Sequence, residues 1–150
     1  MDVLNQELVL REIPYGSAEY QKMLIFRNLH MRVPLGLSLF DEDLSGEVND
    51  HHIAVYRKGD LIGGCIITPL SSTTARMRQV VIAPEYRNHG IGRMMMLFAE
   101  ERTAQLGLSR LILDSRLSAL RFYEKLGYRK VGSQFMEVGL PHYMMEKRIQ

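Results

Sequence analysis

The spacing of hydrophobic and polar residues in the first half of the chain predicts a strand, a helix, a loop and a hairpin. Residues 7–13, ELVLREI, have strand character. A helix is predicted over 18 to about 32, because apolar residues recur there at helical spacing: Tyr20, Met23, Leu24 and Phe26. The polar segment 37–50 predicts a loop or flexible cover. Residues 52–70 then read as two strands joined at Lys58–Asp60.

The second half of the chain predicts alternating strands and helices. A strand over 73–83 precedes a helix over 90–107, whose apolar stripe is Ile91, Met95, Phe98, Ala99 and Leu106. Residues 110–114 form a nearly continuous apolar run, as expected of a strand buried on both faces. A second helix is predicted over 117–126, and three strand candidates end the chain: 128–132, 135–139 and 142–149. This order predicts one mixed α+β domain over residues 1–150.

Composition narrows the class of protein further. Hydrophobic residues make up 46% and charged residues 24%, with a net charge of +2, so neither a nucleic-acid partner nor a membrane surface is expected. The single cysteine, Cys65, excludes an internal disulfide and suits a reducing compartment. The start of the chain has no basic segment followed by an apolar one, so no signal peptide is expected. These features predict a cytoplasmic location.

The stretch PEYRNHGIGRMM, residues 84–95, carries the first candidate chemistry. Two glycines precede a helix whose first turn has no acidic residue, although carboxylates normally favour that position. Glycines let backbone N–H groups approach a ligand without interference from Cβ, and a helix N-terminus attracts anions. Arg87 and Arg93 add positive charge. The third glycine of a dinucleotide-binding loop and the Gly-Lys-Ser/Thr of a phosphate-binding P-loop are both missing.

The full string RQVVIAPEYRNHGIGRMMM, residues 78–96, closely resembles the acetyl-CoA-binding signature of the GCN5-related N-acetyltransferases (GNAT family). SALRFYEKLGY, residues 118–128, resembles a later motif of that family, and VGSQFMEVGLPHYMMEK, residues 131–147, is close to the Gly-Ile-Pro-His-x-x-Met ending of one subgroup. MRVPLGL, residues 31–37, resembles a loop of the same subgroup. The resemblance implies the acyl-CoA N-acyltransferase fold, with a central sheet splayed at the cofactor cleft.

The resemblance also implies which residues bind acetyl-CoA. The loop would hold the pyrophosphate through Arg87, Asn88, His89, Gly90, Ile91, Gly92 and Arg93. The preceding strand would offer backbone hydrogen bonds to the pantetheine amides through Val80, Val81 and Ile82. Phe122 is expected near the cofactor, although its spacing from Leu126 also fits a structural core pair. Tyr123 is the expected proton donor to the thiolate that leaves.

The general base is not settled by the sequence. No acidic residue lies between Asp60 and Glu85, so a carboxylate base on the strand before the loop is not expected. His142 is the preferred candidate, and His52 or a water chain to Glu137 are alternatives. A purely structural role for His142, serving the hydrogen bonds of its strand, is an equally good interpretation. Asp114, at the end of a strand, is expected to cap the following helix.

The predicted function is direct transfer of an acetyl group from acetyl-CoA to an amine of a small molecule or peptide. The alternative is a non-catalytic acyl-CoA-binding or regulatory module. No metal is expected, because the histidines lack spaced cysteine or carboxylate partners. A homodimer is left open. The acidic segment Asp41–Asp43, together with Glu47, mildly favours a cationic acceptor.

Overall fold

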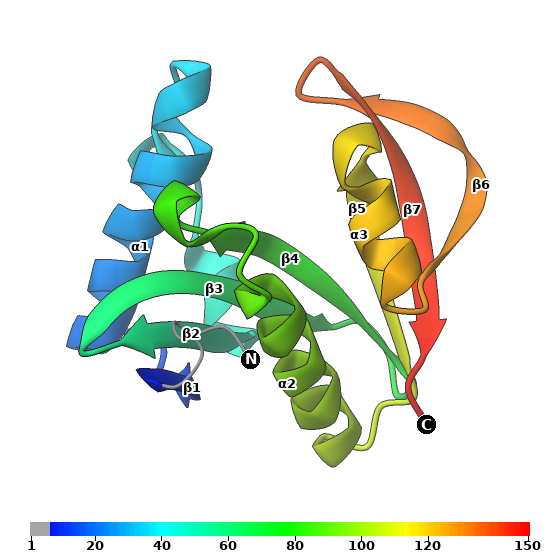
Figure 1. The fold of residues 1–150 in the computed structure, drawn as a ribbon, viewed down its shortest axis with the longest axis horizontal. Coiled ribbons are helices and arrows are strands. Elements are labelled where there is room, and N and C mark those ends of the chain that lie inside the picture. Colours follow the sequence, from blue (N-terminus) through cyan, green and yellow to red (C-terminus); the bar gives the residue numbers. More distant parts are fainter. Residues whose placement is uncertain (1–6) are drawn as a thin grey trace.

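The computed structural model describes residues 7–150, which form one seven-stranded sheet with helices packed on both faces (Figure 1). In spatial order the strands are β1-β2-β3-β4-β5-β7-β6. Their bounds are β1 (Leu8–Ile13), β2 (His51–Arg57), β3 (Asp60–Pro69), β4 (Thr74–Ile82), β5 (Arg110–Arg116), β6 (Arg129–Glu137) and β7 (Leu140–Arg148). All neighbouring strands are antiparallel except β4 and β5, which are parallel. This is the predicted mixed, mostly antiparallel sheet.

The helices divide between the two faces of the sheet. The α-helices are α1 (Ala18–Met31), α2 (Ile91–Gln105) and α3 (Leu120–Lys125), and the 3-10 helices are η2 (Val33–Leu35), η3 (Leu39–Asp41), η4 (Ser45–Asn49), η5 (Pro84–Tyr86) and η6 (Leu117–Ala119). Side chains of α2 and α3 share a core with Ile53 and Val55 of β2, whereas α1 packs with Ala54 between them. Because successive strand residues point to opposite faces, α1 covers one face, and α2 and α3 cover the other (Figure 1).

The parallel strands β4 and β5 pair over only a short stretch. Their register joins Thr74 to Arg110, Ala75 to Leu111 and Arg76 to Ile112, after which the strands diverge (Figure 1). The remainder of β4, as far as Ile82, pairs only with β3 on its other side. One edge of β4 therefore leaves backbone N–H and C=O groups without a strand partner in the middle of the sheet.

An extra residue in β4 changes which face its side chains point to. The register with β3 shifts between Gly64 and Ile66, and Gln79 adopts a φ of 54°. Before the bulge Met77 contributes to the core beneath α2, whereas after it Val81 contributes to the core beneath α1. Without the extra residue, the side chains of Val81 and Met77 would point to the same face of the sheet. The bulge therefore separates a paired half of β4 from a half that borders the opening.

A buried ion pair fixes the segment between α1 and β2. Both guanidinium Nη atoms of Arg27 donate to the carboxylate oxygens of Glu47, each at 2.8 Å, and the Tyr20 hydroxyl donates to Glu47 Oε1 at 2.7 Å. The Arg27 and Glu47 side chains are only 2% and 5% exposed. A buried pair of this kind is stabilised only because its hydrogen bonds are nearly complete. The segment expected to be a flexible cover is thus anchored to α1 and contains η3 and η4.

The structure corrects the sequence interpretation at the C-terminal end. The candidates 128–132 and 135–139 are one strand, β6, interrupted by a register shift between Val131 and Phe135. Gly132, at a φ of 75°, supplies the left-handed residue at this irregularity. The predicted hairpin is present, with Lys58 and Gly59 both at positive φ between β2 and β3. Residues 1–6, on which the signal-peptide expectation partly depends, lie outside the described residues.

We predict that Glu47→Gln destabilises the fold strongly, because it leaves the buried Arg27 cation without a carboxylate. Removal of one partner of a buried pair typically costs about 3–5 kcal/mol. Glu42→Gln, which breaks a more exposed pair with Arg32, should cost less than about 1 kcal/mol. Chemical denaturation of the two variants and the parent measures both changes, and equal losses would contradict the assignment.

The same pair makes stability depend on pH. Burial raises the pKa of Glu47, but the hydrogen bonds from Arg27 and Tyr20 outweigh it, so the pKa lies below its usual value. A carboxyl whose pKa is lowered on folding contributes stability above its unfolded pKa and loses it as pH falls through the folded pKa. The parent should therefore lose more stability on acidification than Glu47→Gln does.

Candidate functional site

The loop between β4 and α2 is shaped by two residues in left-handed conformations and by one side-chain hydrogen bond. Asn88 and Gly90 both have left-handed conformations, with φ of 65° and 79°. Arg87 turns back toward β4, where its Nε donates to the carbonyl oxygen of Ile82 at 3.1 Å. His89 lies in the same loop. The predicted loop residues are thus brought together at the point where β4 ends and α2 begins.

The N-terminus of α2 exposes backbone donors. Gly90 is the N-cap residue and offers no capping side chain, and the first turn contains no acidic residue. The backbone N–H of Met94 donates to the Gly90 carbonyl at 3.1 Å. Helix geometry leaves the N–H groups of Ile91, Gly92 and Arg93 without a partner in the helix. Together with the helix dipole, these groups make a site suited to a phosphate or pyrophosphate.

The two glycines of the loop have different structural roles. Gly90 is needed for its left-handed φ, which other residues adopt only with strain. Gly92 lies within α2, and a Cβ atom there would come within 3.3 Å of the Phe122 ring. Phe122 of α3 therefore packs against the start of α2 while remaining partly exposed. This contact joins the two helices beside the opening between β4 and β5.

The free edge of β4 carries the strand residues expected to contact pantetheine. Ala83 donates its N–H to the Ile62 carbonyl of β3 at 2.8 Å. Because successive backbone N–H groups of a strand point to opposite sides, the N–H of Ile82 points away from β3. Val80 and Ile82 pack with the core beneath α2, and Val81 packs with the core beneath α1.

Tyr123 lies on α3 with only 7% of its surface exposed. Its ring contacts those of Phe122 and Tyr128, with centroid distances of 5.0 and 5.8 Å. Burial raises the pKa of the Tyr123 phenol well above its usual value, with a smaller contribution from Cys65. The phenol is therefore protonated at neutral pH and can donate a hydrogen bond. Its hydroxyl has no hydrogen-bond partner within residues 7–150.

His142 lies on β7, opposite Arg116 of β5 and Phe135 of β6. It is 4% exposed and stacks on Phe135 at a centroid distance of 5.8 Å. Its Nδ1 is 2.8 Å from the Leu140 carbonyl oxygen, which can only accept, so Nδ1 carries a proton. Nε2 lies 3.6 Å from Glu137 Oε2. The ring is thus oriented by its own strand and has a carboxylate near its other nitrogen.

His52 and Asp114, two other residues singled out from the sequence, have structural roles. His52 is 1% exposed, its Nε2 donates to the Glu47 carbonyl at 2.9 Å, and its ring contacts Tyr20. It therefore supports the segment between α1 and β2. Asp114 does not cap a helix; it pairs with Arg76 of β4 at 2.9 Å, where the two strands begin to diverge. Charge attraction across β4 and β5 replaces the expected cap.

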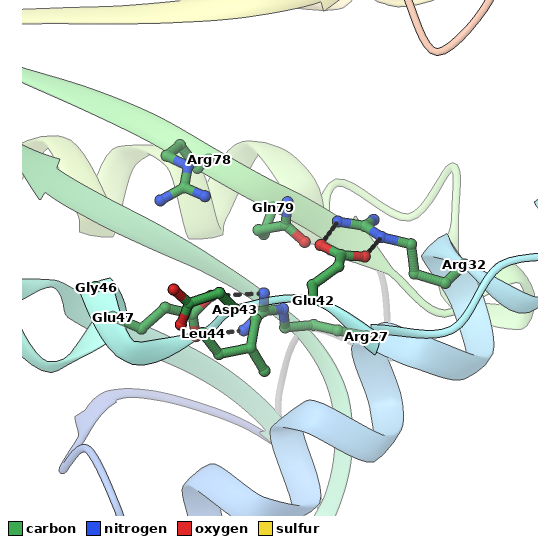
Figure 2. Close-up of a pocket in the computed structure, with 9 residues that line it drawn as sticks. All are labelled: Arg27, Arg32, Glu42, Asp43, Leu44, Gly46, Glu47, Arg78 and Gln79. Carbon is green, nitrogen blue, oxygen red and sulfur yellow. Dashed lines mark hydrogen bonds and ion pairs between the residues drawn. The ribbon is translucent and has the colours of Figure 1, made fainter. Parts of the chain in front are cut away.

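A polar pocket of about 250 Å³ lies beside the bulge of β4, on the face covered by α1 (Figure 2). Its lining comprises Arg27, Arg32, Glu42, Asp43, Leu44, Gly46, Glu47, Arg78 and Gln79. Sequence reasoning found the acidic residues of this pocket and missed Arg27 and Arg78. Arg32 donates to both oxygens of Glu42, at 2.6 and 3.2 Å, so this carboxylate is neutralised as Glu47 is by Arg27. Two of the four acids expected to favour a cationic acceptor are therefore already neutralised within the protein.

Neither a metal-binding cluster nor a membrane-spanning helix is found among residues 7–150. Within residues 7–150, no cluster of three or more histidine, cysteine, aspartate or glutamate side chains is arranged to hold a metal ion. None of the helices in the same range combines the length and apolar character needed to cross a lipid bilayer.

A sheet that opens beside an anion-binding helix end is the architecture of an acyl-CoA-dependent transferase. The model of the acetyltransferase (GNAT) family matches residues 19–128, so the chain belongs to that family and is an acyltransferase. The uncharacterized protein YyaT of Bacillus subtilis is 33% identical over 73% of this chain and 74% of its own length.

Solved structures share the complete fold. A Lactobacillus plantarum protein assigned as an N-acetyltransferase superimposes with a TM-score of 0.83 and 26% identity, over 95% of this chain and 99% of that chain. A GNAT family acetyltransferase from Elizabethkingia anophelis with acetyl-CoA bound has a TM-score of 0.72 at 12% identity, over 95% and 99% of the two chains. This second likeness concerns the fold alone. The acyl-CoA N-acyltransferase fold expected from the sequence is confirmed.

We predict that Gly90→Asp weakens coenzyme A binding far more than Gly90→Asn does. Both side chains are similar in size, and both residues tolerate a left-handed φ and can cap a helix. Only Asp places a negative charge where the pyrophosphate is expected. Calorimetric titration with coenzyme A should show a further loss of about tenfold or more for Asp, as expected when like charges meet at a helix N-terminus. Equal affinities of the two variants would show that the pyrophosphate does not bind at this loop.

Proposed function

We propose that this protein is an acetyl-CoA-dependent N-acetyltransferase that moves the acetyl group directly to an amine of a small molecule or peptide. The observation that carries the proposal is the opening between β4 and β5, which has the N-terminus of α2 at one end. Tyr123 and His142 come from elements on the β5 side of this opening. Acetyl-CoA, when bound, supplies the acetyl group as a thioester.

Binding of the donor rests on backbone groups. The N–H groups of Ile91, Gly92 and Arg93, with the charge of the Arg87 and Arg93 guanidinium groups, would hold the pyrophosphate. The free edge of β4 would pair with amides of the donor as a further strand does. Gly92 supports this role, because it has no Cβ atom to keep a ligand from the start of α2; a Cβ there would also crowd the Phe122 ring at 3.3 Å.

Backbone and side-chain donors would stabilise the charges that develop during transfer. An N–H from the divergent half of β4, at Val81 or Ile82, is expected to donate to the carbonyl oxygen. The N–H of Ile82 is favoured because it points away from β3. The Tyr123 hydroxyl would donate to the thiolate that leaves. Burial raises the pKa of Tyr123, so the phenol is protonated and has a hydrogen to donate to the thiolate.

His142 is the proposed base for the acceptor. An amine with a pKa near that of lysine must lose a proton before attack, at a cost of about 4 kcal/mol at neutral pH. With Nδ1 protonated toward the Leu140 carbonyl, Nε2 is the nitrogen that can accept a proton. The nearby Glu137 carboxylate would then stabilise the charged ring. Glu137 is exposed, so it can also pass the proton to water.

We predict that Tyr123→Phe lowers kcat by at least about tenfold while leaving the affinity for acetyl-CoA nearly unchanged. The hydroxyl forms no hydrogen bond with residues 7–150, so its removal should leave the packing of α3 intact. Thiol release across a panel of amines gives kcat, and calorimetry gives the dissociation constant.

The same two measurements distinguish an enzyme from a binding module. Stoichiometric binding of acetyl-CoA without thiol release for any acceptor would overturn the proposed transfer in favour of a regulatory module. Unchanged turnover in Tyr123→Phe would instead remove only Tyr123 from its role.

We predict that His142→Gln lowers kcat/KM and removes the rise of activity with pH that a general base produces. Activity, corrected for the fraction of neutral acceptor amine, should rise with pH in the parent, because the imidazole must be unprotonated to accept the proton. Glutamine can donate to the Leu140 carbonyl but cannot take up a proton. A full pH profile of both proteins is the measurement. A profile that keeps its rising limb with a uniformly lower rate would assign His142 a structural role.

A further inference from the structure

One face of β4, β5 and β7 gathers charged side chains on both sides of the opening. Met77, Leu113 and Met145 point into the core beneath α2, so the residues next to them in the strands point to the opposite face. On β4 these include Arg76 and Arg78, on β5 Asp114 and Arg116, and on β7 His142, which is paired with Arg116. The opposite face of the divergent strands therefore places three arginines around the opening, with Arg116 beside the proposed base.

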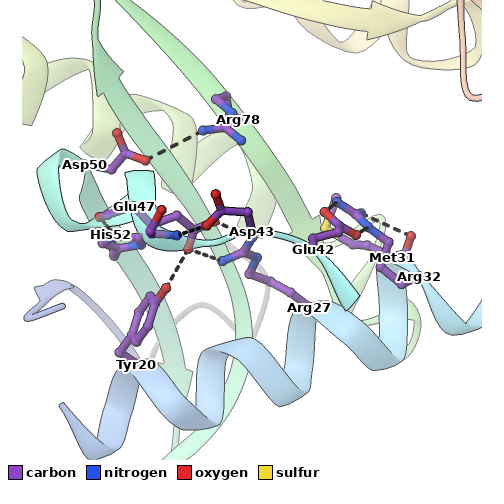
Figure 3. Close-up of polar contacts among 11 residues, drawn as sticks. Tyr20, Arg27, Met31, Arg32, Glu42, Asp43, Glu47, Asp50, His52 and Arg78 are labelled. Carbon is purple, nitrogen blue, oxygen red and sulfur yellow. Dashed lines mark hydrogen bonds and ion pairs between the residues drawn. The ribbon is translucent and has the colours of Figure 1, made fainter. Parts of the chain in front are cut away.

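The acids near this face are already paired. Glu42 is bound by Arg32 and Glu47 by Arg27, as Figures 2 and 3 show, and Asp114 is bound by Arg76. Asp43 is the remaining pocket carboxylate, and it accepts the backbone N–H of Ser45 at 3.0 Å. The pocket thus holds few acidic groups able to attract a cationic ligand.

Two arginines on this face keep unused hydrogen-bond donors. Arg78 is 40% exposed and lines the pocket; it forms an ion pair with Asp50 at 3.7 Å, too long for a hydrogen bond, so its N–H donors stay available (Figure 3). Arg116 is exposed, and its guanidinium has no hydrogen bond or ion pair within residues 7–150. The other two arginines of the pocket, Arg27 and Arg32, each form a bidentate pair with a carboxylate. A planar guanidinium with free donors suits a carboxylate.

We propose that the acceptor amine also carries a carboxylate, which Arg78 and Arg116 bind from the two sides of the opening. This inference rests on the proposed function. Arg116 lies opposite His142 in the register of β5 and β7, so a carboxylate held there brings the amine of the same small molecule near the base. The substrate class is a small amino acid-like compound with both groups, and Arg78 and Arg116 determine the specificity.

The experiment compares three acceptors that share one carbon skeleton: an α-amino acid, its amide and the decarboxylated amine. Each kcat/KM is corrected for the fraction of neutral amine, because the three compounds differ in amine pKa. For the parent protein, the amino acid should be acetylated with a corrected kcat/KM at least about tenfold higher than the other two, the factor expected for one hydrogen bond between charged groups.

Variants assign this preference to the two arginines. Arg78→Gln and Arg116→Gln should each lower kcat/KM for the amino acid by about tenfold and leave the values for the amide and the amine within about twofold. Arg148→Gln is the matched control, because Arg148 is an exposed residue on the same face of β7, at the far end from His142. Its kinetics should match the parent for all three acceptors. Binding of acetyl-CoA, measured by calorimetry, verifies that each variant is folded.

The possible results separate this inference from the proposed function. Efficient acetylation of the amide or the decarboxylated amine, at or above the rate of the amino acid, overturns the carboxylate inference and leaves the N-acetyltransferase intact. An equal loss for all three acceptors in Arg78→Gln and Arg116→Gln also overturns it, since the arginines would then act without recognising the carboxylate. Absence of thiol release with every acceptor overturns both.

Discussion

The interruption of pairing between β4 and β5 is the constraint on which the rest of the site depends. A sheet interior rarely leaves backbone donors and acceptors without partners, because each unpaired buried group costs free energy. Here the pairing ends at Arg76 and Ile112, and the bulge at Gln79 follows three residues after Arg76. The diverging edge therefore requires water or a ligand with amide groups. A pantetheine chain has such groups, and the N-terminus of α2, which suits a phosphate, begins just after β4 ends.

The same bulge separates the residues proposed to bind the donor from those proposed to bind the acceptor, because it places them on opposite faces of the sheet. Val80 and Ile82 belong to the α2 face, with Tyr123 and the anion-binding loop, whereas Arg78 lies on the α1 face, with the polar pocket. A donor and an acceptor can then approach the opening from opposite sides. Direct transfer between them needs no covalent intermediate on the protein, and within residues 7–150 the single cysteine is buried with its pKa raised by that burial to about 12. A thiol in this state is a poor nucleophile.

Much of this arrangement was predictable because it depends on local sequence. The loop at Gly90, the hairpin at Gly59 and the apolar strand before Asp114 each leave a signal within a few residues. The buried pair of Arg27 and Glu47 leaves no such signal, because its partners are twenty residues apart and look like solvated charges in the sequence. The pairing of Arg76 with Asp114 depends on the parallel register of β4 and β5, which also cannot be inferred from spacing. Strand β6 was predicted as two strands because a glycine such as Gly132 can lie either at the end of a strand or at an irregularity within one.

The charge of the pocket shows why composition alone misleads about specificity. The segment Asp41–Asp43 with Glu47 has four acids, and by count it favours a cationic ligand. Folding places Arg27 and Arg32 of the α1 end against Glu47 and Glu42, so both acids are consumed in internal pairs. A ligand therefore meets only the groups that keep free hydrogen-bond donors or acceptors after pairing, and Arg78 and Arg116 are the cationic ones near the opening. An arginine that forms a bidentate pair with a carboxylate of the protein has few N–H donors left to bind a ligand. Groups with free hydrogen-bond donors are therefore a better guide to a ligand than a count of acidic residues.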